Sequence, residues 1–468
     1  MNFRGFVCIL GFVFAALPVQ AQSHVQVYPA PAGEPLSQRF SVKIDGHDSP
    51  VYLAHVRVIG VVKSHDIPEV QTDGEASFTS FDTDGKAEVT VLCKQDVKAA
   101  KVLPSSYGIT PQVSGKTVTF TLAATQQATV EINGDWNNSL HVFANPVETD
   151  VPNLKDKNLI YYGPGLHVIG PQKIGSGKTV YIAGGAVVYG KHATEGEKGA
   201  IFALNGDNIT VRGRGIIDGS LYPKTPGSGN ILYAKGHNLK FEGVTLRDSN
   251  NWNMPLFESN HVTIDNMKIF GWRGNSDGFD VVNSQDVDIS NSFLRTFDDL
   301  VVVKTRDKGQ QPSKNITVKH MVLWNEIAHA LTIGTEIHEP VENVIFSDCD
   351  VIHSMDRDYD LMVFNGAEST VRHVVFDDIR IEESRRIASL YTGRAYHDMP
   401  EYGHIDDVTF RNIRTVRPQS PDPIQFKGLD AGHAIHDVHF ENVTIDGKPL
   451  KQSEIKANEF VTGVTVTP

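Results

Sequence analysis

The sequence predicts an all-β protein, a right-handed parallel β-helix preceded by a small antiparallel β-sandwich. Three observations predict it. Short segments of alternating polar and apolar residues fill positions 24–145. Beyond residue 153, β-branched strand segments recur with a loose period, and helical periodicity is almost absent from these recurring segments.

The segments of the first region, such as FSVKID and KAEVTVL, are separated by turn signals that include Asp45-Gly46 and Asp84-Gly85. Period-two patterning at this spacing is typical of a small antiparallel sandwich. A proline-bearing stretch, NPVETDVP at 145–152, then marks a boundary. We therefore expect a sandwich domain at 24–145 and a β-helix catalytic domain at 153–468.

The recurring segments share one pattern, exemplified by HVTIDNMKIFG and DVDISNSFLRT: an apolar strand, a polar or glycine turn, and a second apolar strand. Strand repeats this short cannot bury an apolar face alone and must stack on their neighbours. A β-propeller would need longer, four-stranded blades, so a parallel β-helix is predicted. The reference positions, 23 to 34 residues apart, are Val180, Ile209, Leu239, Val262, Val287, Ile316, Val344, Val374, Val408 and Val438.

The N-terminus carries Arg4, an apolar run from Phe6 to Leu17, and small residues up to Ala21. This pattern is typical of a secretory signal peptide at 1–21, because the apolar run is too short to span a bilayer. A membrane anchor is the less favoured interpretation. We expect a periplasmic or secreted mature protein that is not held in a membrane.

Charge and cysteine content exclude other classes. The formal net charge of -13 becomes -14 without Arg4, since 42 basic residues then face 56 acidic ones. Nucleic-acid binding through phosphate neutralisation is therefore disfavoured. Cys93 and Cys349, far apart in sequence, do not predict a disulfide framework and are expected to be small buried hydrophobes. Neither a metal nor another cofactor is expected, and a monomer is the default.

Acidic residues and one histidine recur at similar phase in three consecutive repeats. Asp277 lies 15 residues after Val262, Asp298 lies 11 after Val287, and His329 lies 13 after Ile316. Neighbouring coils are about 4.8 Å apart, so these carboxylates should lie about 5 to 10 Å from one another. Inverting glycoside hydrolysis needs roughly 6.5 to 9.5 Å between its two carboxyl groups.

Crowded carboxylates cannot all ionise freely, because each negative charge raises the proton affinity of its neighbours. One can stay protonated as an acid while another activates water. An Asp-Asp pair alone is weak evidence: the pairs at 377–378 and 406–407 fall near the start of their coils, where solvated turns are expected. The case for Asp298 and Asp299 depends on their flanks and partners.

Those flanks resemble the polygalacturonase family of glycoside hydrolases. NSDGFD at 275–280 resembles the family's N-T-D segment, and DDLVVVK at 298–304 resembles its D-D-C-V-A-V-K segment at the usual spacing. AHALTIGT at 328–335 is similar to its G-H-G-x-S-I-G-S segment. The resemblance covers roughly 180–446, while the N-terminal sandwich is more like the arrangement in the related dextranase and isopullulanase family.

The resemblance implies a pectin-lyase-like solenoid and single-displacement, inverting hydrolysis of O-glycosidic bonds in a polysaccharide or oligosaccharide. Asp298 would be the proton donor, Asp277 and Asp299 would hold the water as base, and His329 would orient or tune them. One departure concerns the substrate. The family's R-I-K segment, which grips a substrate carboxylate, should fall near Leu361-Met362-Val363, where this chain has neither arginine nor lysine. Galacturonan is therefore doubtful as substrate.

Further residues near these coils are candidates for binding the sugar, because aromatic faces stack on sugar rings and polar groups bind hydroxyls. The substrate-binding candidates are Asn275, Trp272, Lys304, Glu336 and Arg394, with Trp252, Tyr391 and His397 nearby and Arg357, Arg385 or Arg386 as replacement cations. Ordinary packing is an equal alternative for most of them.

Two other functions stay open. A polysaccharide lyase on the same fold would use Ca²⁺ and yield an unsaturated product, so a chelator would inhibit it. A non-catalytic, glycan-binding β-helix would keep its binding when Asp298 is replaced by asparagine.

Overall fold

The computed structural model describes Met1 and residues 24–58, 72–192, 199–223, 229–354, 359–394, 401–416 and 420–468. The expected signal-peptide run and the candidates Arg357 and His397 lie outside these residues. Within them, no helix is long and apolar enough to cross a membrane. The helices among the described residues are two short 3₁₀ helices, η1 (Ser105–Tyr107) and η2 (Gln452–Glu454).

The N-terminal region forms two packed sheets, with strand orders β1-β5-β11-β10-β7, where β4 also pairs with β5, and β3-β2-β6-β9-β8. All these pairings are antiparallel except β5 with β11, where Leu140 aligns with Ser77. The predicted small antiparallel sandwich is confirmed, with this one parallel pair. The five strands between β5 and β11 provide the long crossover that parallel pairing needs. The strands are β1 (Val25–Val27), β2 (Phe40–Ile44), β3 (His47–Ser49), β4 (Tyr52–Val58), β5 (Thr72–Thr83), β6 (Lys86–Cys93), β7 (Ala100–Leu103), β8 (Gln112–Ser114), β9 (Thr117–Ala123), β10 (Gln127–Ile132) and β11 (Asp135–Pro146).

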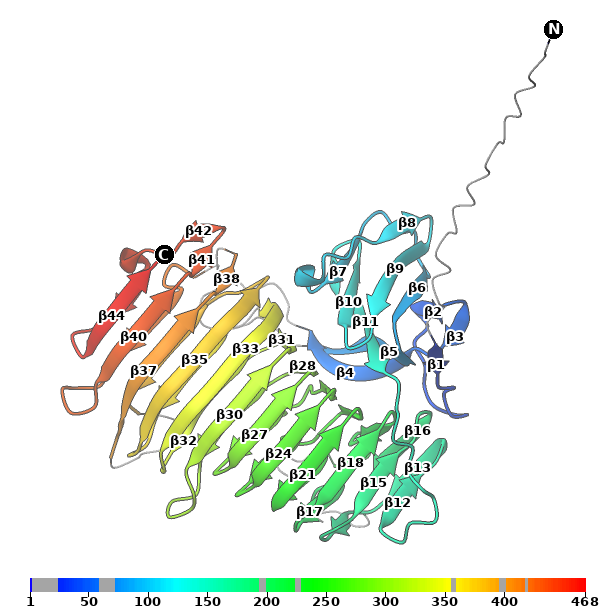
Figure 1. Ribbon diagram of the computed structural model, residues 1–468, viewed down its shortest axis with the longest axis horizontal. Coiled ribbons are helices and arrows are strands. Elements are labelled where there is room, and N and C mark those ends of the chain that lie inside the picture. The colour runs from blue at the N-terminus through cyan, green and yellow to red at the C-terminus, as the bar shows by residue number, and fades with distance from the viewer. Residues whose placement is uncertain are drawn as a thin grey trace.

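The rest of the chain winds into a parallel β-helix, which confirms the predicted fold (Figure 1). A complete coil gives two strands, or one long strand, to a 22-stranded sheet and one strand to an 11-stranded sheet. The 11-stranded sheet contains β14 (Gln172–Ile174), β17 (Phe202–Asn205), β20 (Leu232–Lys235), β23 (Met254–Phe257), β26 (Phe279–Val282), β29 (Val301–Thr305), β32 (Leu331–Ile337), β34 (Leu361–Asn365), β36 (Ala388–Thr392), β39 (Ile424–Lys427) and β43 (Ile455–Ala457).

The 22-stranded sheet forms the other two walls of the solenoid. It contains β12 (Leu159–Tyr162), β13 (Gly165–Ile169), β15 (Thr179–Ile182), β16 (Ala186–Gly190), β18 (Ile209–Gly213), β19 (Ile216–Asp218), β21 (His237–Glu242), β22 (Thr245–Arg247), β24 (Asn260–Asp265), β25 (Lys268–Phe270), β27 (Gln285–Ser290), β28 (Phe293–Thr296), β30 (Ser313–Lys319), β31 (Val322–Asn325), β33 (Val341–Ser354), β35 (Thr370–Ile381), β37 (His404–Arg411), β38 (Arg414–Thr415), β40 (Ile435–Glu441), β41 (Thr444–Ile445), β42 (Lys448–Pro449) and β44 (Val461–Thr467).

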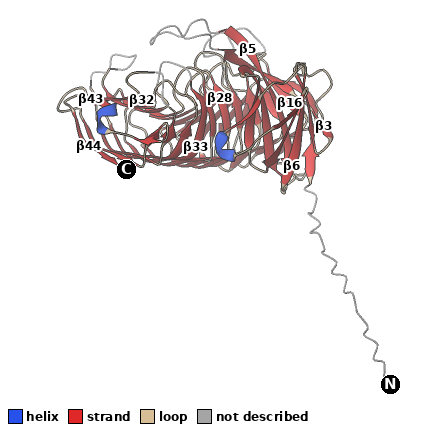
Figure 2. Cartoon of the chain, turned by 90° about the horizontal axis from the view of Figure 1, so that it is seen from above, coloured by secondary structure: helices blue, strands red, loops and turns tan. Residues whose placement is uncertain are grey.

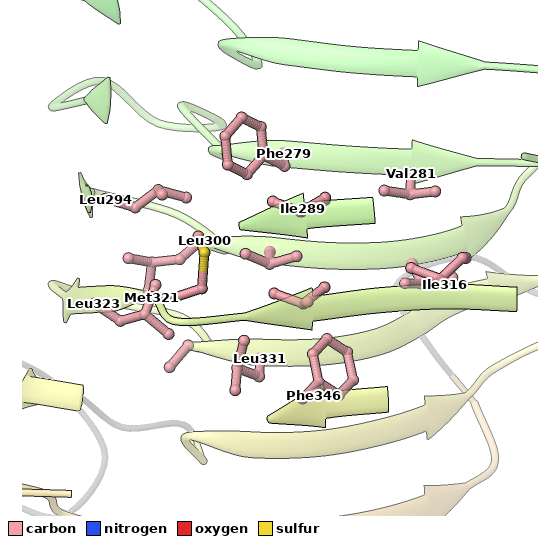
Figure 3. Close-up of a cluster of buried hydrophobic side chains, with 14 of the residues drawn as sticks. Phe279, Val281, Ile289, Leu294, Leu300, Ile316, Met321, Leu323, Leu331 and Phe346 are labelled. Carbon is pink, nitrogen blue, oxygen red and sulfur yellow. The ribbon is translucent and has the colours of Figure 1, made fainter. Parts of the chain in front are cut away.

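Stacked apolar side chains fill the solenoid, as the repeat pattern requires. Equivalent positions of successive coils lie directly over one another, so Phe346, Phe376, Phe410 and Phe440 form a column with ring centroids 5.0, 5.1 and 4.9 Å apart. Figure 3 shows apolar side chains packed in this way inside the coils between Phe279 and Phe346. Because such interiors are close-packed, the backbone at the start of each strand is held rigidly by the side chains packed inside the coil.

Asparagines at or next to strand starts adopt left-handed backbone geometry, with φ of 57° at Asn208, directly before β18, and 55° at Asn238, within β21. Their side chains bond along the stack, since Asn238 Nδ2 donates to Asn208 Oδ1 at 2.5 Å. Asparagine tolerates this geometry better than most residues. These asparagines therefore have a structural role, because they connect successive coils.

The sandwich packs against the outside of the β-helix (Figures 1 and 2). One buried cluster contains residues of both parts, with Val56, Phe78 and Phe143 from the sandwich and Phe270 and Trp324 from the coils. Such shared burial of large apolar side chains fixes the sandwich in place over the coils of the acidic residues.

Candidate active site

The three acidic positions and His329 lie at equivalent places in adjacent coils. In the register of the sheet, Phe279 pairs with Val301, and Val301 pairs with Leu331. Asp277, Asp299 and His329 each stand two residues before these aligned positions. Backbone bonds join their turns, because the Gly278 N–H donates to the Asp299 carbonyl at 2.8 Å and the Leu300 N–H to the His329 carbonyl at 2.9 Å.

The three carboxyl groups converge. One carboxylate oxygen from each of Asp277, Asp298 and Asp299 lies within 4.8 Å of the others. The coil spacing predicted carboxylates about 5 to 10 Å apart, and these nearest oxygens lie at the short end of that range. Three carboxylates at such separations are also a donor set that a hard cation can use.

Asp298 is half-buried, and its carboxylate accepts two backbone hydrogen bonds, from the N–H of Asn275 at 3.2 Å and of Asp299 at 3.0 Å. Burial, followed by the negative charge of Asp299, raises the pKa of Asp298 to about 6, against the opposing effect of those bonds. This carboxyl group can therefore hold a proton in mildly acidic solution.

Asp299 has the opposite tendency. Its Oδ1 lies 2.6 Å from His329 Nδ1 and also accepts the His329 backbone N–H at 3.2 Å. Burial alone would raise the pKa of Asp299, but the charge and hydrogen bonds of His329 hold it below the usual value. Two adjacent residues thus have pKa values displaced in opposite directions, which is the arrangement that separate acid and base roles need.

Lys304 lies beneath the cluster, where its Nζ is 3.5 Å from Asp277 Oδ2 and 3.1 Å from Asp280 Oδ1. Burial first, and then the charge of Asp280, raises the pKa of Asp277 well above its ordinary value. Burial likewise raises the pKa of Asp280 to about 7, although Lys304 opposes it. Lys304 therefore offsets part of the negative charge of this buried pair.

Sequence reasoning missed two buried carboxyl groups, Asp280 and Asp360. Asp280 stands within the NSDGFD segment, as an acid inside an apolar strand, and that was its signal. Asp360 lies behind His329, with its backbone carbonyl accepting the Ala330 N–H at 3.1 Å and its side chain accepting the Ser384 hydroxyl at 2.5 Å. Burial raises the pKa of Asp360 to about 7. No short motif marked this residue.

The other predicted residues fall in different surroundings. Asn275 is exposed beside Asp298, and Glu336 on β32 is half-buried and electrostatically coupled to Lys304. Arg394 is exposed just beyond β36. Trp272, only 7% exposed, lies against the sandwich, with Arg57 and Arg273 both 5.2 Å from its ring centre. Trp272 therefore packs between the two domains.

An aromatic run leads to the acidic cluster from the N-terminal side. The ring centre of Trp252 lies 4.3 Å from Lys304 Nζ and 6.2 Å from the ring centre of Phe257, and Phe257 stacks on Tyr233 at 5.3 Å. These rings are half-buried. On the other side, Phe364 meets Tyr391 edge-on at 4.7 Å. Aromatic faces on both sides suit the apolar faces of sugar rings.

The register also locates the strand where a cationic segment was expected. Thr332 pairs with Met362, and Gly334 with Phe364, so β34 offers no lysine or arginine at these positions. Beyond them, Arg386 lies with its guanidinium 5.4 Å from the ring centre of Tyr359.

Comparison with known proteins agrees with this arrangement. Residues 165–465 match glycosyl hydrolases family 28. The chain belongs to this family. An exopolygalacturonase of Cochliobolus carbonum is 24% identical over an alignment of 286 positions that covers 52% of this chain and 62% of the fungal protein. An exopolygalacturonase X-2 of Emericella nidulans is also 24% identical, with 54% of its length covered. The chain thus aligns with less than two thirds of these relatives.

Solved structures show the same fold. The family 28 exopolygalacturonase of Yersinia enterocolitica has a TM-score of 0.53 at 14% identity, covering 81% of this chain and 93% of that one. Dex49A from Penicillium minioluteum has a TM-score of 0.54 at 15% identity and covers 94% of this chain and 89% of its own. The predicted resemblance of this family 28 member to polygalacturonases is thereby confirmed.

Proposed function

We propose that this protein is an inverting glycoside hydrolase that cleaves O-glycosidic bonds in a polysaccharide or oligosaccharide. The observation that carries the proposal is the convergence of Asp277, Asp298 and Asp299, whose nearest oxygens lie within 4.8 Å of one another, with His329 Nδ1 2.6 Å from Asp299 Oδ1. The raised pKa of Asp298 and the lowered pKa of Asp299 fit acid and base roles for these two residues. Membership of family 28 supports the same reaction.

In the proposed mechanism, protonated Asp298 donates its proton to the glycosidic oxygen as the bond to the anomeric carbon breaks. Ionised Asp299, held by His329, accepts a proton from the water that attacks the opposite face of the sugar. Asp277, next to Lys304, helps to hold that water. Products leave, Asp299 releases the proton it took from water to solvent, and Asp298 regains a proton, which restores the starting state.

Polygalacturonan is the first substrate to test, because the relatives bear polygalacturonase names. Neutral and deoxy-sugar polymers come next, because Met362 and Phe364 occupy β34 where a uronate would need a cation. An extracellular or periplasmic location is proposed with this function, since such polymers lie outside the cell and the N-terminus resembles a signal peptide.

The test is a glycan panel with product chromatography, run on the wild-type chain and on Asp298→Asn. We expect hydrolysis of at least one polymer and a loss in kcat of about 10²- to 10⁴-fold in the variant. A product that absorbs in the ultraviolet and forms only without chelator would instead identify a lyase. Glycan binding without turnover, equal in both proteins, would identify a binding module.

A further inference from the structure

Arg57 of the sandwich contacts the three turns that carry the acidic cluster and His329. It stands on β4, which lies along the flank of the coils (Figure 1). Its guanidinium Nη1 is anchored within the sandwich by Asp73 at 2.6 Å. Its contacts with Trp272, Phe297 and Glu326 cross to the β-helix.

The first two turns are held by the side chain. Arg57 Nε–H donates to the Trp272 carbonyl at 2.8 Å. The guanidinium lies 5.2 Å from the ring centre of Trp272 and 5.3 Å from that of Phe297. Trp272 stands five residues before Asp277, and Phe297 directly precedes Asp298. The planar, delocalised guanidinium can make cation–π contacts with both rings at the same time.

The third turn is held by the backbone. The Arg57 N–H donates to Glu326 Oε2 at 2.9 Å, while Glu326 Oε1 pairs with Arg295 at 2.8 Å. Glu326 stands three residues before His329, and Arg295 three before Asp298. Both members of this ion pair are buried, so their geometry is fixed.

One hydrogen bond connects these contacts to the proton donor. The turn that begins at Trp272 carries Asn275, whose N–H donates to Asp298 Oδ2. This bond favours the ionised form of Asp298. A turn released by loss of Arg57 would weaken it, so the pKa of Asp298 would rise.

We propose that Arg57 is a positioning residue that sets the geometry of the acidic cluster, which makes the sandwich a working part of the catalytic unit. The inference rests on the proposed glycoside hydrolase function. It excludes the role of a detachable carbohydrate-binding module for the sandwich, because removal of one interface side chain would change the chemistry itself.

The experiment compares Arg57→Ala and Arg57→Lys with a matched interface control, Glu382→Gln, in the full chain. Glu382 lies on the coils and accepts the Ser105 N–H of the sandwich at 2.5 Å, with Lys101 at 3.5 Å, so it crosses the same interface away from the acidic turns. For each protein kcat, KM, the pH profile of kcat/KM and the Tm are measured.

We expect kcat of Arg57→Ala to fall about 10- to 100-fold with KM nearly unchanged. The alkaline limb of its pH profile should move up by about 0.5 to 1 pH unit, because the weakened hydrogen bond from Asn275 would raise the pKa of Asp298 by about that amount. Arg57→Lys keeps the charge but not the planar fork, so it should show the same shift, reduced in size. Glu382→Gln should lower the Tm and leave kcat and the limb unchanged.

The inference is overturned if both Arg57 variants keep the wild-type kcat and alkaline limb, or if Glu382→Gln moves them equally. If Arg57→Ala does not fold, the kcat and alkaline limb of Arg57→Lys decide whether the inference holds. A wild-type chain that hydrolyses its glycan, with Asp298→Asn inactive and Arg57 variants normal, would leave the proposed function intact and refute only this inference. A wild-type chain without hydrolysis would refute both.

Discussion

His329 Nδ1 and Asp299 Oδ1 lie 2.6 Å apart, and the same oxygen accepts the His329 backbone N–H. The imidazole therefore contacts the carboxylate that we propose as base, one residue away from the proposed acid. Because this contact favours the ionised form of Asp299, it separates the protonation states of two adjacent aspartates.

Replacing His329 with phenylalanine should reduce kcat by about 10- to 100-fold, the worth of a hydrogen bond to a charged group. The pKa of Asp299 should rise, so the acid limb of the pH profile should move to higher pH. A matched control is His338→Phe, because His338 Nδ1 makes a similar 2.8 Å contact with Glu368 away from the cluster. Equal losses in the two variants would argue against a special role for His329.

The pH dependence of kcat/KM should be bell-shaped with an acidic optimum. Its alkaline limb should fall near pH 6, because the acid must be protonated and the pKa of Asp298 is raised to about 6. Its acid limb should lie below the ordinary aspartate range, because the pKa of Asp299 is lowered. The two limbs belong to the coupled cluster as a whole. Full activity above pH 8 would contradict the assignment of Asp298 as acid.

Stability should decrease as the pH rises from 5 to 8. The pKa values of Asp280, Glu326 and Asp360 are each raised to about 7, mainly by burial. A carboxyl group whose folded pKa is raised contributes stability that is complete below its unfolded pKa and is lost as the pH passes the folded value. The Tm should therefore be higher at pH 5. Asp360→Asn, which cannot ionise, should flatten this dependence; a Tm that rises with pH would contradict it.

Much of the fold and site could be predicted because the repeat determines both. The aligned apolar positions from Val180 to Val438 predicted the coils, and similar phase within adjacent coils predicted that Asp277, Asp298 and His329 would meet. Asp280 was missed because an acidic residue inside an apolar strand gives no sign of its partner in the sequence. Its role becomes clear only from the structure, where Lys304 lies beside it. Arg57 and the packing of Trp272 were missed because their partners belong to another domain, over 200 residues away.

The spacing of the carboxyl groups could be predicted only as a range. Oxygens of Asp277, Asp298 and Asp299 approach within 4.8 Å, at the short end of the roughly 5 to 10 Å that the coil spacing predicts. The separations of roughly 6.5 to 9.5 Å for inversion and 5 to 5.5 Å for retention are measured between whole carboxyl groups. Coil spacing fixes the distance between backbones, and side-chain rotamers then decide where the oxygens lie. Family membership, and not this distance, therefore supports inversion.

The most direct test of the account is the anomeric configuration of the first product, followed by proton NMR immediately after the wild-type chain is added to a glycan that it cleaves. Inversion at the anomeric carbon is the predicted result, with Asp298 as acid and Asp299 activating water. A product that first appears with the configuration of the substrate would show a covalent intermediate on one of these carboxylates and would contradict the proposed mechanism.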